Sequence, residues 1–165
     1  MNHPFVNNWR DLTEKPESDF LLLRENENMI KIGIIGVGHL GKIHLKCLLN
    51  IPEFEITGFY DINPIVSAAI ENEFGIKPFS SADDLISNSE AVDIVTPTVS
   101  HYTIAAKALR SSKHIFLEKP LVATSSEASK LAVFAREANV VIQVGHVERF
   151  YPAFLAAKPH LKQPV

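Results

Sequence analysis

A glycine-rich turn directly after a short apolar run is the feature that most constrains the fold of this chain. Residues 30–35 form the apolar run, and Gly36-Val37-Gly38-His39-Leu40-Gly41 follows without a gap. Such a turn at the start of a helix lets the backbone approach a diphosphate, whose charge is attracted by the amide hydrogens of the first helical turn. The context predicts a strand, a phosphate-binding turn and a helix, in that order.

Further apolar runs rich in Ile and Val alternate with helical patterns along the chain. This alternation is typical of β-α-β units and a parallel sheet. We expect an α/β fold of the Rossmann type, a doubly wound parallel sheet of about six strands with helices on both faces. The predicted strands should be buried on both faces and cover residues 30–35, 54–60, 77–79, 92–95, 114–116 and 140–144.

Capping residues mark several helix ends. Asn63-Pro64 begins a predicted helix that ends at Gly75, and Ser81 begins a short one. Thr124 and Glu127 fit a capping box at the start of another helix. A helix is also expected to start at Ser100. The helix after the glycine-rich turn should bury the face that carries Leu40, Ile43, His44, Cys47 and Leu48.

Composition excludes several classes of function. Sixteen Lys and Arg against 19 Asp and Glu give a formal net charge of -3, so no general attraction for nucleic acid is expected. No apolar run reaches the roughly 20 residues that span a bilayer, so no membrane association is expected. The single Cys47 offers neither an internal disulfide nor a metal cluster, which favours a reducing, cytoplasmic location.

Asp61 follows the second predicted strand, about 20 residues after the glycine-rich turn. An acidic side chain there accepts hydrogen bonds from the adenosine ribose, whereas a 2′-phosphate would meet like charge. The sequence therefore predicts NAD as the cofactor, with NADP possible. Asp61 could instead simply begin the turn to Asn63-Pro64. An adenosine-ligand transferase is also open, because enzymes that use S-adenosylmethionine carry a similar acidic residue.

Two polar clusters follow later predicted strands, at the edge where ligands of parallel sheets bind. Thr96-Pro97 with His101 forms the first cluster, and Glu118-Lys119-Pro120 forms the second. Pro97 would fix the backbone beside the cofactor, and the Lys119 ammonium would stabilise an alkoxide or transfer a hydroxyl proton. The alternative is structural, with a helix-starting loop, a surface histidine and a solvated turn.

With these motifs in this order, residues 30 to about 152 resemble the Gfo/Idh/MocA family of oxidoreductases. The resemblance implies NAD(P)-dependent hydride transfer at a hydroxyl of a sugar, cyclitol or nucleotide-sugar. It also implies that Lys119 is catalytic and that the Lys119-Pro120 peptide is a candidate for a cis bond. The expected cofactor-binding residues are Gly36, Gly38, His39, Leu40, Gly41, Asp61, Ile62, Thr96, Pro97, His101, Glu118, Lys119 and Pro120.

The segment 144–152 is similar to family members that oxidise UDP-N-acetylglucosamine at its 3-position. His146 and Arg149 are therefore candidate substrate residues; alternatively, they serve packing and a salt bridge at a domain junction.

The resemblance also sets the expected domain organisation. Residues 1–29 would be an N-terminal extension, 30–147 the NAD(P)-binding domain and 148–165 the start of a crossover. Family members carry a C-terminal substrate domain, which we expect this chain to lack, and the full-length form should be a homo-oligomer. The alternative function is a noncatalytic NAD(H)-binding or redox-sensing module.

Overall fold

Five parallel strands form a sheet in the computed structural model, which describes residues 29–161. Their order across the sheet is β2-β1-β3-β4-β5, and each neighbouring pair is parallel. Apart from Met29, the predicted N-terminal extension lies outside the described residues. The strands are β1 (Ile30–Ile35), β2 (Phe54–Tyr60), β3 (Ala91–Ile94), β4 (His114–Leu117) and β5 (Ile142–Val144).

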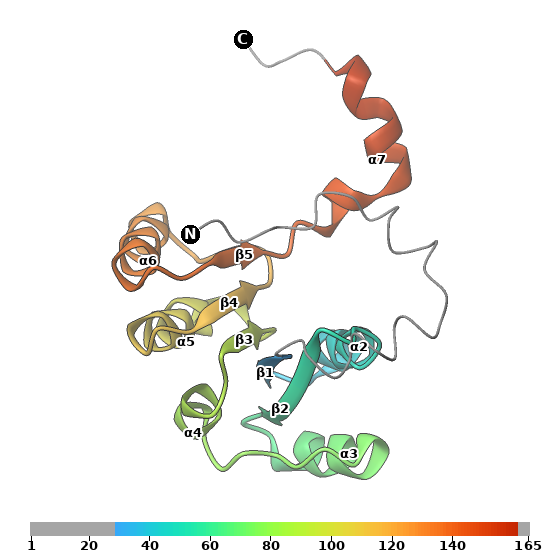
Figure 1. Ribbon diagram of the computed structural model, residues 1–165, viewed down its shortest axis with the longest axis vertical. Helices are drawn as coiled ribbons and strands as arrows, with labels where there is room; N and C mark the ends of the chain where they lie inside the picture. Colours follow the sequence, from blue (N-terminus) through green and yellow to red (C-terminus); the bar gives the residue numbers. More distant parts are fainter. Residues whose placement is uncertain (1–28, 162–165) are drawn as a thin grey trace.

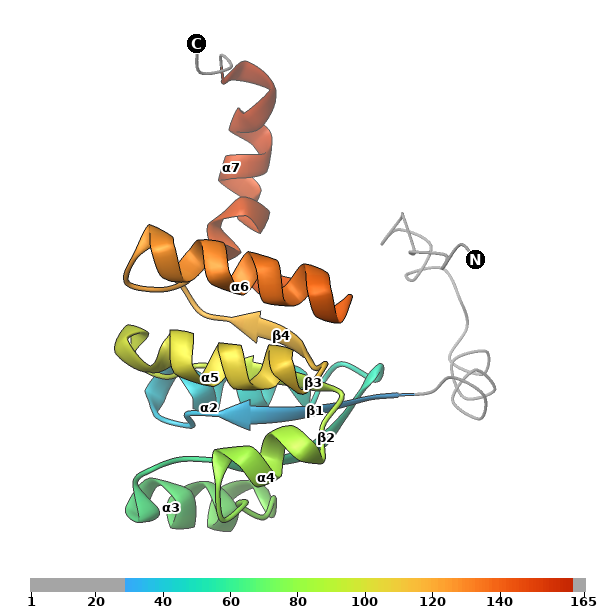
Figure 2. The same cartoon turned by 90° about the vertical axis from the view of Figure 1, so that its left-hand side faces the viewer.

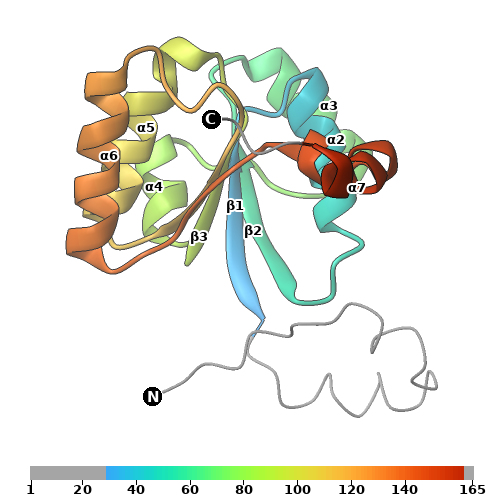
Figure 3. The ribbon, with the colours of Figure 1, turned by 90° about the horizontal axis from the view of Figure 1, so that it is seen from above.

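Helices cover both faces of the sheet (Figure 1). Helices α4, α5 and α6 lie on one side and α2 and α3 on the other, as the view from above also shows (Figure 3). The predicted doubly wound α/β class is therefore confirmed. The helices that flank the sheet are α2 (His39–Leu48), α3 (Pro64–Phe74), α4 (Ala82–Ser87), α5 (Thr98–Arg110) and α6 (Ser125–Ala138).

The predicted helix caps are present. The side chain of Asn63 accepts a hydrogen bond from the backbone N–H of Ile65, and Gly75 ends α3 in the left-handed conformation. Thr124 and Glu127 form the capping box of α6. Helix α5 begins at Thr98 rather than at the predicted Ser100, because Pro97 already sets an extended backbone at its N-cap.

The sheet separates two hydrophobic cores. Successive residues of a strand point to opposite faces, so Ile34 packs with Leu45 and Phe59 beneath α2 and α3, whereas Ile35 belongs to the core on the other side. Complete burial of an aliphatic side chain contributes about 1.5–3 kcal/mol. The two cores therefore fix the carboxyl ends of β1 and β3, which lie side by side.

The predicted strand at residues 77–79 is wrong. Pro78 pairs with Phe59 in an isolated bridge, and a single hydrogen bond runs from the Phe79 N–H to the Phe59 carbonyl oxygen at 2.7 Å. Proline has no N–H to donate to a ladder, so the pairing does not extend. Full burial of every strand is also wrong, because the edge strands β2 and β5 carry exposed and half-buried residues.

The predicted buried face of α2 is also wrong. Its fully buried residues are Gly41 and Leu45, whereas Leu40 and Ile43 are 45% and 44% exposed. A Cβ at Gly41 would lie 1.9 Å from the Gly36 carbonyl oxygen. The helix therefore meets the turn through its one residue without a side chain, and this contact decides its orientation.

After β5 the chain leaves the sheet. The segments η2 (Val147–Phe150), α7 (Pro152–Ala157) and η3 (Lys158–His160) contain no buried residue. Figure 2 shows α7 projecting away from the body of the domain. Between residues 29 and 161, no helix has both the length and the apolar character that crossing a membrane requires.

Candidate cofactor-binding and active site

The three glycines of the turn have three different surroundings. Gly36 has a φ of +88°, and a Cβ there would lie 2.7 Å from the Val95 carbonyl oxygen. Gly41 has no room for a Cβ because of the Gly36 carbonyl, whereas a Cβ at Gly38 would meet nothing within 4 Å in the described part of the chain. The first and third glycines are thus required by the fold, and the second borders open space where a ligand can approach the backbone.

The N-terminus of α2 opens beside Gly38. Gly38 is the N-cap of the helix, and a glycine supplies no side-chain cap. The first intrahelical hydrogen bond to this residue runs from the Lys42 N–H to the Gly38 carbonyl oxygen at 2.9 Å. The amide hydrogens of residues 39–41 precede this bond, so they have no partner within the helix and can bind an anion.

Asp61 connects the end of β2 to the glycine-rich turn. Its carboxylate accepts hydrogen bonds from the backbone N–H of Val37 at 2.9 Å and of Asn63 at 2.8 Å. Asp61 therefore takes the turn-forming role that the sequence left open, and its negative charge lies beside the glycine-rich turn. Each carboxylate oxygen retains further acceptor capacity for a ribose hydroxyl.

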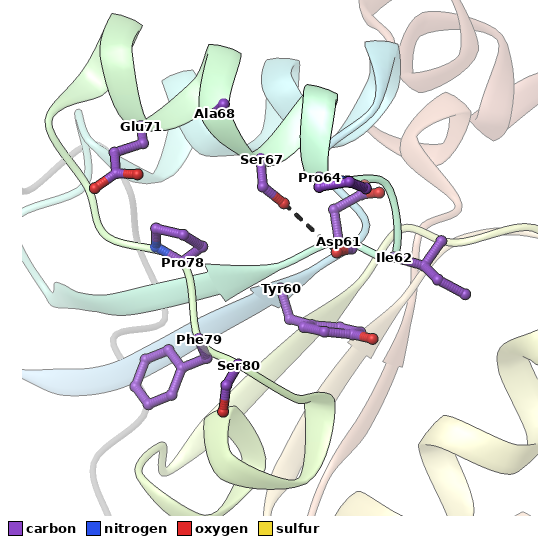
Figure 4. Close-up of a pocket in the computed structure, with 10 residues that line it drawn as sticks. All are labelled: Tyr60, Asp61, Ile62, Pro64, Ser67, Ala68, Glu71, Pro78, Phe79 and Ser80. Carbon is purple, nitrogen blue, oxygen red and sulfur yellow. Dashed lines mark hydrogen bonds between the residues drawn. The ribbon is translucent and has the colours of Figure 1, made fainter.

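A pocket of about 510 Å³ lies beside Asp61 at the end of β2. Figure 4 shows it between the first turns of α3 and the segment around Pro78, with the Ser67 hydroxyl bonded to the Asp61 carbonyl oxygen at 3.5 Å. Ile62 projects away from the other lining residues and is 88% exposed. The lining residues are Tyr60, Asp61, Ile62, Pro64, Ser67, Ala68, Glu71, Pro78, Phe79 and Ser80.

His101 connects the two loops that follow β3 and β4. Its Nε2 lies 2.7 Å from the Thr96 carbonyl oxygen, and its Nδ1 lies 3.0 Å from that of Pro120. The residue is 1% exposed, so its ring packs between the two loops, and its cofactor-binding role stays a prediction. Its geometry gives it another task, which is to hold Thr96 and Pro120 at a fixed separation.

Lys119 is exposed at the start of the loop after β4. Its Nζ lies 3.1 Å from Oε1 of Glu148 in η2, and the Lys119–Pro120 peptide is cis, as expected. A hydrogen bond from its own backbone and the Lys119 ammonium hold the pKa of Glu148 below its usual value. The sequence reasoning missed Glu148, although its neighbours His146 and Arg149 had drawn attention to this segment.

Glu118 points the opposite way from Lys119. The residue is 8% exposed, and Oε1 lies 3.4 Å from Nε2 of His44 in α2. Nδ1 of His44 lies 2.9 Å from Oδ2 of Asp93, a buried residue of β3. The Glu118 carboxylate therefore faces the interior, and its expected contact with the cofactor stays a prediction. His44 and Asp93 were not assigned to a site from the sequence, although an aspartate within an apolar strand is such a signal.

The remaining predicted residues line the open side. Thr96 is half-buried and receives a hydrogen bond from the Ser100 hydroxyl at 2.8 Å. His39, Leu40 and Pro97 are exposed around the mouth of the glycine-rich turn and the β3 loop. His146 and Arg149 are exposed in the segment after β5, and neither forms an ion pair within residues 29–161.

This arrangement matches a known family. The model of the Gfo/Idh/MocA family, an oxidoreductase family with an NAD-binding Rossmann fold, matches residues 30–146. The chain belongs to this family. The resemblance that the motifs indicated is therefore confirmed, and the turn, Asp61 and the two polar loops lie within the NAD-binding Rossmann domain of Gfo/Idh/MocA oxidoreductases.

Two curated Gfo/Idh/MocA relatives are dehydrogenases of glucose derivatives. UDP-N-acetylglucosamine 3-dehydrogenase of Acidithiobacillus ferrooxidans is 36% identical over 124 residues, which cover 75% of this chain and 39% of the relative. Glucose-6-phosphate 3-dehydrogenase of Bacillus subtilis is 35% identical over 122 residues, which cover 74% of this chain and 35% of the relative. The chain thus spans well under half the length of either relative.

The solved structure of the Acidithiobacillus enzyme has the same fold over this region. It superimposes with a TM-score of 0.75 at 33% identity and covers 81% of this chain and 44% of that structure. The likeness extends over nearly all described residues, so the Rossmann architecture of the Gfo/Idh/MocA family is shared by both chains.

Proposed function

We propose that this chain binds NAD(H) and forms the cofactor half of an oxidoreductase that acts on a hydroxyl group of a sugar-type substrate. The observation that carries the proposal is the open space over Gly38, beside the uncapped N-terminus of α2 and the Asp61 carboxylate. Open space alone would fit any small ligand. Backbone donors on one side and a fixed carboxylate on the other suit a diphosphate joined to a ribose.

Each part of the cofactor has candidate residues in this arrangement. Gly36, Gly38 and the amide hydrogens of residues 39–41 would hold the diphosphate, and Asp61 would hold the adenosine ribose. The exposed Ile62 offers an apolar surface to the adenine ring. Thr96 and Pro97 would border the nicotinamide side, because the carboxyl ends of β1 and β3 are neighbours.

Lys119 is the residue we propose for the chemistry. NAD, when bound, accepts or donates the hydride. The Lys119 ammonium is an exposed cation on the loop after β4 and can stabilise an alkoxide or carry the hydroxyl proton. Glu148 lies 3.1 Å from it and would keep the ammonium in place until a substrate hydroxyl binds.

We propose NAD rather than NADP as the preferred cofactor. A 2′-phosphate would approach the Asp61 carboxylate, and Glu71 adds a second acidic group to the same pocket. The negative charges of the phosphate and the carboxylates would repel each other. The nearby backbone N–H groups of Val37 and Asn63 are already bonded to Asp61, so they do not offset this repulsion.

For the substrate we propose a phosphate-bearing hexose that reacts at its 3-hydroxyl. The names of both relatives describe this chemistry, one with a nucleotide-sugar and one with a sugar phosphate. The exposed Arg149 would supply positive charge for the phosphate, and His146 is exposed nearby in the same segment. A full-length homo-oligomer in the cytoplasm completes the proposal, and the free thiol of Cys47 suits a reducing compartment.

A ligand titration tests the proposal directly. We expect NADH to raise the melting temperature of the chain, by on the order of 10 °C at a concentration of about 100 Kd. Nicotinamide fluorescence should saturate in the same range. A response to S-adenosylmethionine alone would overturn the proposal in favour of a transferase. Binding of NADH without turnover in a protein that also carries a substrate domain would instead indicate a redox-sensing module.

A further inference from the structure

Three ionisable side chains from three elements meet beneath the loop that carries Lys119. His44 comes from α2, Asp93 from β3 and Glu118 from the residue that follows β4. The two ring nitrogens of His44 face one carboxylate each, at 2.9 Å for Asp93 and 3.4 Å for Glu118. The proposed chemistry at Lys119 uses none of the three, so their assembly in the interior needs an explanation.

The cluster is costly to bury unless its charges compensate one another. Asp93 is 3% exposed, and its Oδ1 has no hydrogen-bond partner among residues 29–161. Burial raises the pKa of Asp93, against the opposing effect of the hydrogen bond with His44. The same hydrogen bond is the largest contribution to a raised pKa of His44, and Glu118 adds to it. An imidazolium between two carboxylates is the charge state that compensates best.

The surroundings of His44 leave it few other partners. Asp93 and Glu118 are the titratable groups that contact its ring from the sheet side. The Phe116 ring of β4 packs edge-on against it, with 5.8 Å between ring centroids. A change in the protonation of His44 therefore acts most strongly on these two carboxylates.

Glu118 contacts both His44 and the backbone of Lys119. Its Oε2 accepts a hydrogen bond from the Lys119 backbone N–H at 3.0 Å, while Oε1 faces His44. On its other side the carboxylate touches Gly145 after β5, where a Cβ would lie 2.5 Å from Oε1. The carboxylate is thus held between α2 and the end of β5, and it fixes the backbone from which the Lys119 side chain projects.

We propose that His44, Asp93 and Glu118 are positioning residues, which hold Lys119 in its working position while His44 is protonated and release it when His44 loses its proton. This inference rests on the proposed role of Lys119 at the reaction centre. It assigns Glu118 a function that its burial allows, in place of contact with the cofactor. It also explains why the residue after β5 is a glycine.

Nuclear magnetic resonance of the full 165-residue chain tests the coupling. The ring nitrogens of ¹⁵N-labelled histidine report the protonation of His44, and the amide proton of Lys119 reports its bond to Glu118. We expect His44 to titrate above the ordinary value of 6.5, and the Lys119 amide shift to follow with the same midpoint. A ring that served packing alone would not move the Lys119 amide in this way.

Three variants separate the parts of the cluster. Asp93→Asn should lower the midpoint of His44, because its strongest partner loses charge. Glu118→Gln should abolish the co-titration of the Lys119 amide while His44 still titrates. The matched control is Glu137→Gln, which changes an exposed carboxylate of α6 and should leave both titrations as in the wild type. If Asp93→Asn does not fold, the wild-type chain and Glu118→Gln still decide the question.

Two results would overturn the proposal: a His44 midpoint at or below 6.5, or a Lys119 amide whose shift does not follow His44. NADH is titrated into the same samples. Loss of co-titration with normal NADH binding refutes the positioning cluster and leaves the proposed function intact. Co-titration without any NADH binding supports the coupling within the cluster and refutes the proposed function. The two proposals can therefore fail separately.

Discussion

The carboxylate of Asp61 accepts a hydrogen bond from the backbone N–H of Val37 across 2.9 Å, which joins the end of β2 to the glycine-rich turn. The other carboxylate oxygen binds the Asn63 N–H at the start of α3. One side chain therefore shapes the turn and carries the charge that would face a ribose. Removing its charge and removing its hydrogen bonds are separable experiments.

Asp61→Ala should weaken NADH binding by about 10- to 100-fold, because a hydrogen bond to a charged group contributes about 1.5–3 kcal/mol. Asp61→Asn keeps an acceptor but loses the charge, so it should narrow the preference for NADH over NADPH. Fluorescence titrations with both cofactors measure these effects. Glu137→Gln, which changes an exposed carboxylate of α6 outside this pocket, serves as the control. An unchanged preference in Asp61→Asn would reduce Asp61 to a turn residue.

Gly38 and Gly41 should respond in opposite ways to the same substitution. Gly38 has a φ of -62° and open space where a Cβ would stand, so Gly38→Ala should fold with a nearly unchanged melting temperature but lose NADH affinity. Gly41→Ala places a methyl group against the Gly36 carbonyl and should lower the melting temperature strongly. Thermal denaturation with and without NADH measures both. Wild-type NADH affinity in Gly38→Ala would contradict the assigned diphosphate site.

His101→Ala should destabilise the domain by about 2–5 kcal/mol, because it leaves a cavity and removes the partner of buried carbonyl groups. The effect should come from the lost connection between the Thr96 and Pro120 loops. Urea denaturation measures the free energy of unfolding. Thr103→Ala changes an exposed position of the same helix and should cost little. Equal losses in the two variants would show that His101 has no special role.

Lys119→Ala should lower turnover by about 100-fold or more while NADH affinity stays near wild type. Turnover can be measured in a chimaera in which residues 30–146 replace the matching segment of the Acidithiobacillus enzyme. Lys130→Ala removes an exposed lysine of α6 and is the control. Unchanged turnover in Lys119→Ala, in a chimaera that is active with wild-type Lys119, would remove the residue from the chemistry.

Local signals predicted the parts of the fold that depend on neighbouring residues. The bounds of β1 and β2 match the structure, as do the caps of α3 and the capping box of α6. Each depends on a few consecutive side chains. The predicted strand at residues 77–79 failed because Pro78 cannot extend a ladder, and this reason was already visible in the sequence.

The candidate site was harder to predict, because its chemistry depends on which way a side chain points. Glu118 and Lys119 are consecutive, and one faces the interior while the other faces solvent. The motif assigned both residues to the cofactor site, and gave a catalytic role to Lys119 alone. His44 and Asp93 come from separate elements, and only the packing of α2 on the sheet brings them together. Spacing within one helix had assigned His44 to a hydrophobic face.

The pH dependence of stability follows from the pair of His44 and Asp93. The pKa of His44 is raised, chiefly by its hydrogen bond with Asp93. A group with a raised pKa binds its proton more tightly in the folded state, so its contribution is complete below the unfolded value of 6.5 and is lost as pH rises through the folded value. The pKa of Asp93 is also raised, from its ordinary value of 3.8, so its contribution to stability is likewise lost as pH rises.

We therefore expect the melting temperature of the wild-type chain to fall as pH rises above 6.5, and the fall to be smaller in His44→Gln. The difference between the two proteins reports His44 together with its coupling to Asp93, because the titrating groups outside this cluster are shared. His160→Gln, which changes an exposed histidine of η3, should keep the wild-type slope. If wild type and His44→Gln lose stability in parallel, then His44 binds its proton no more tightly in the folded state than in the unfolded one.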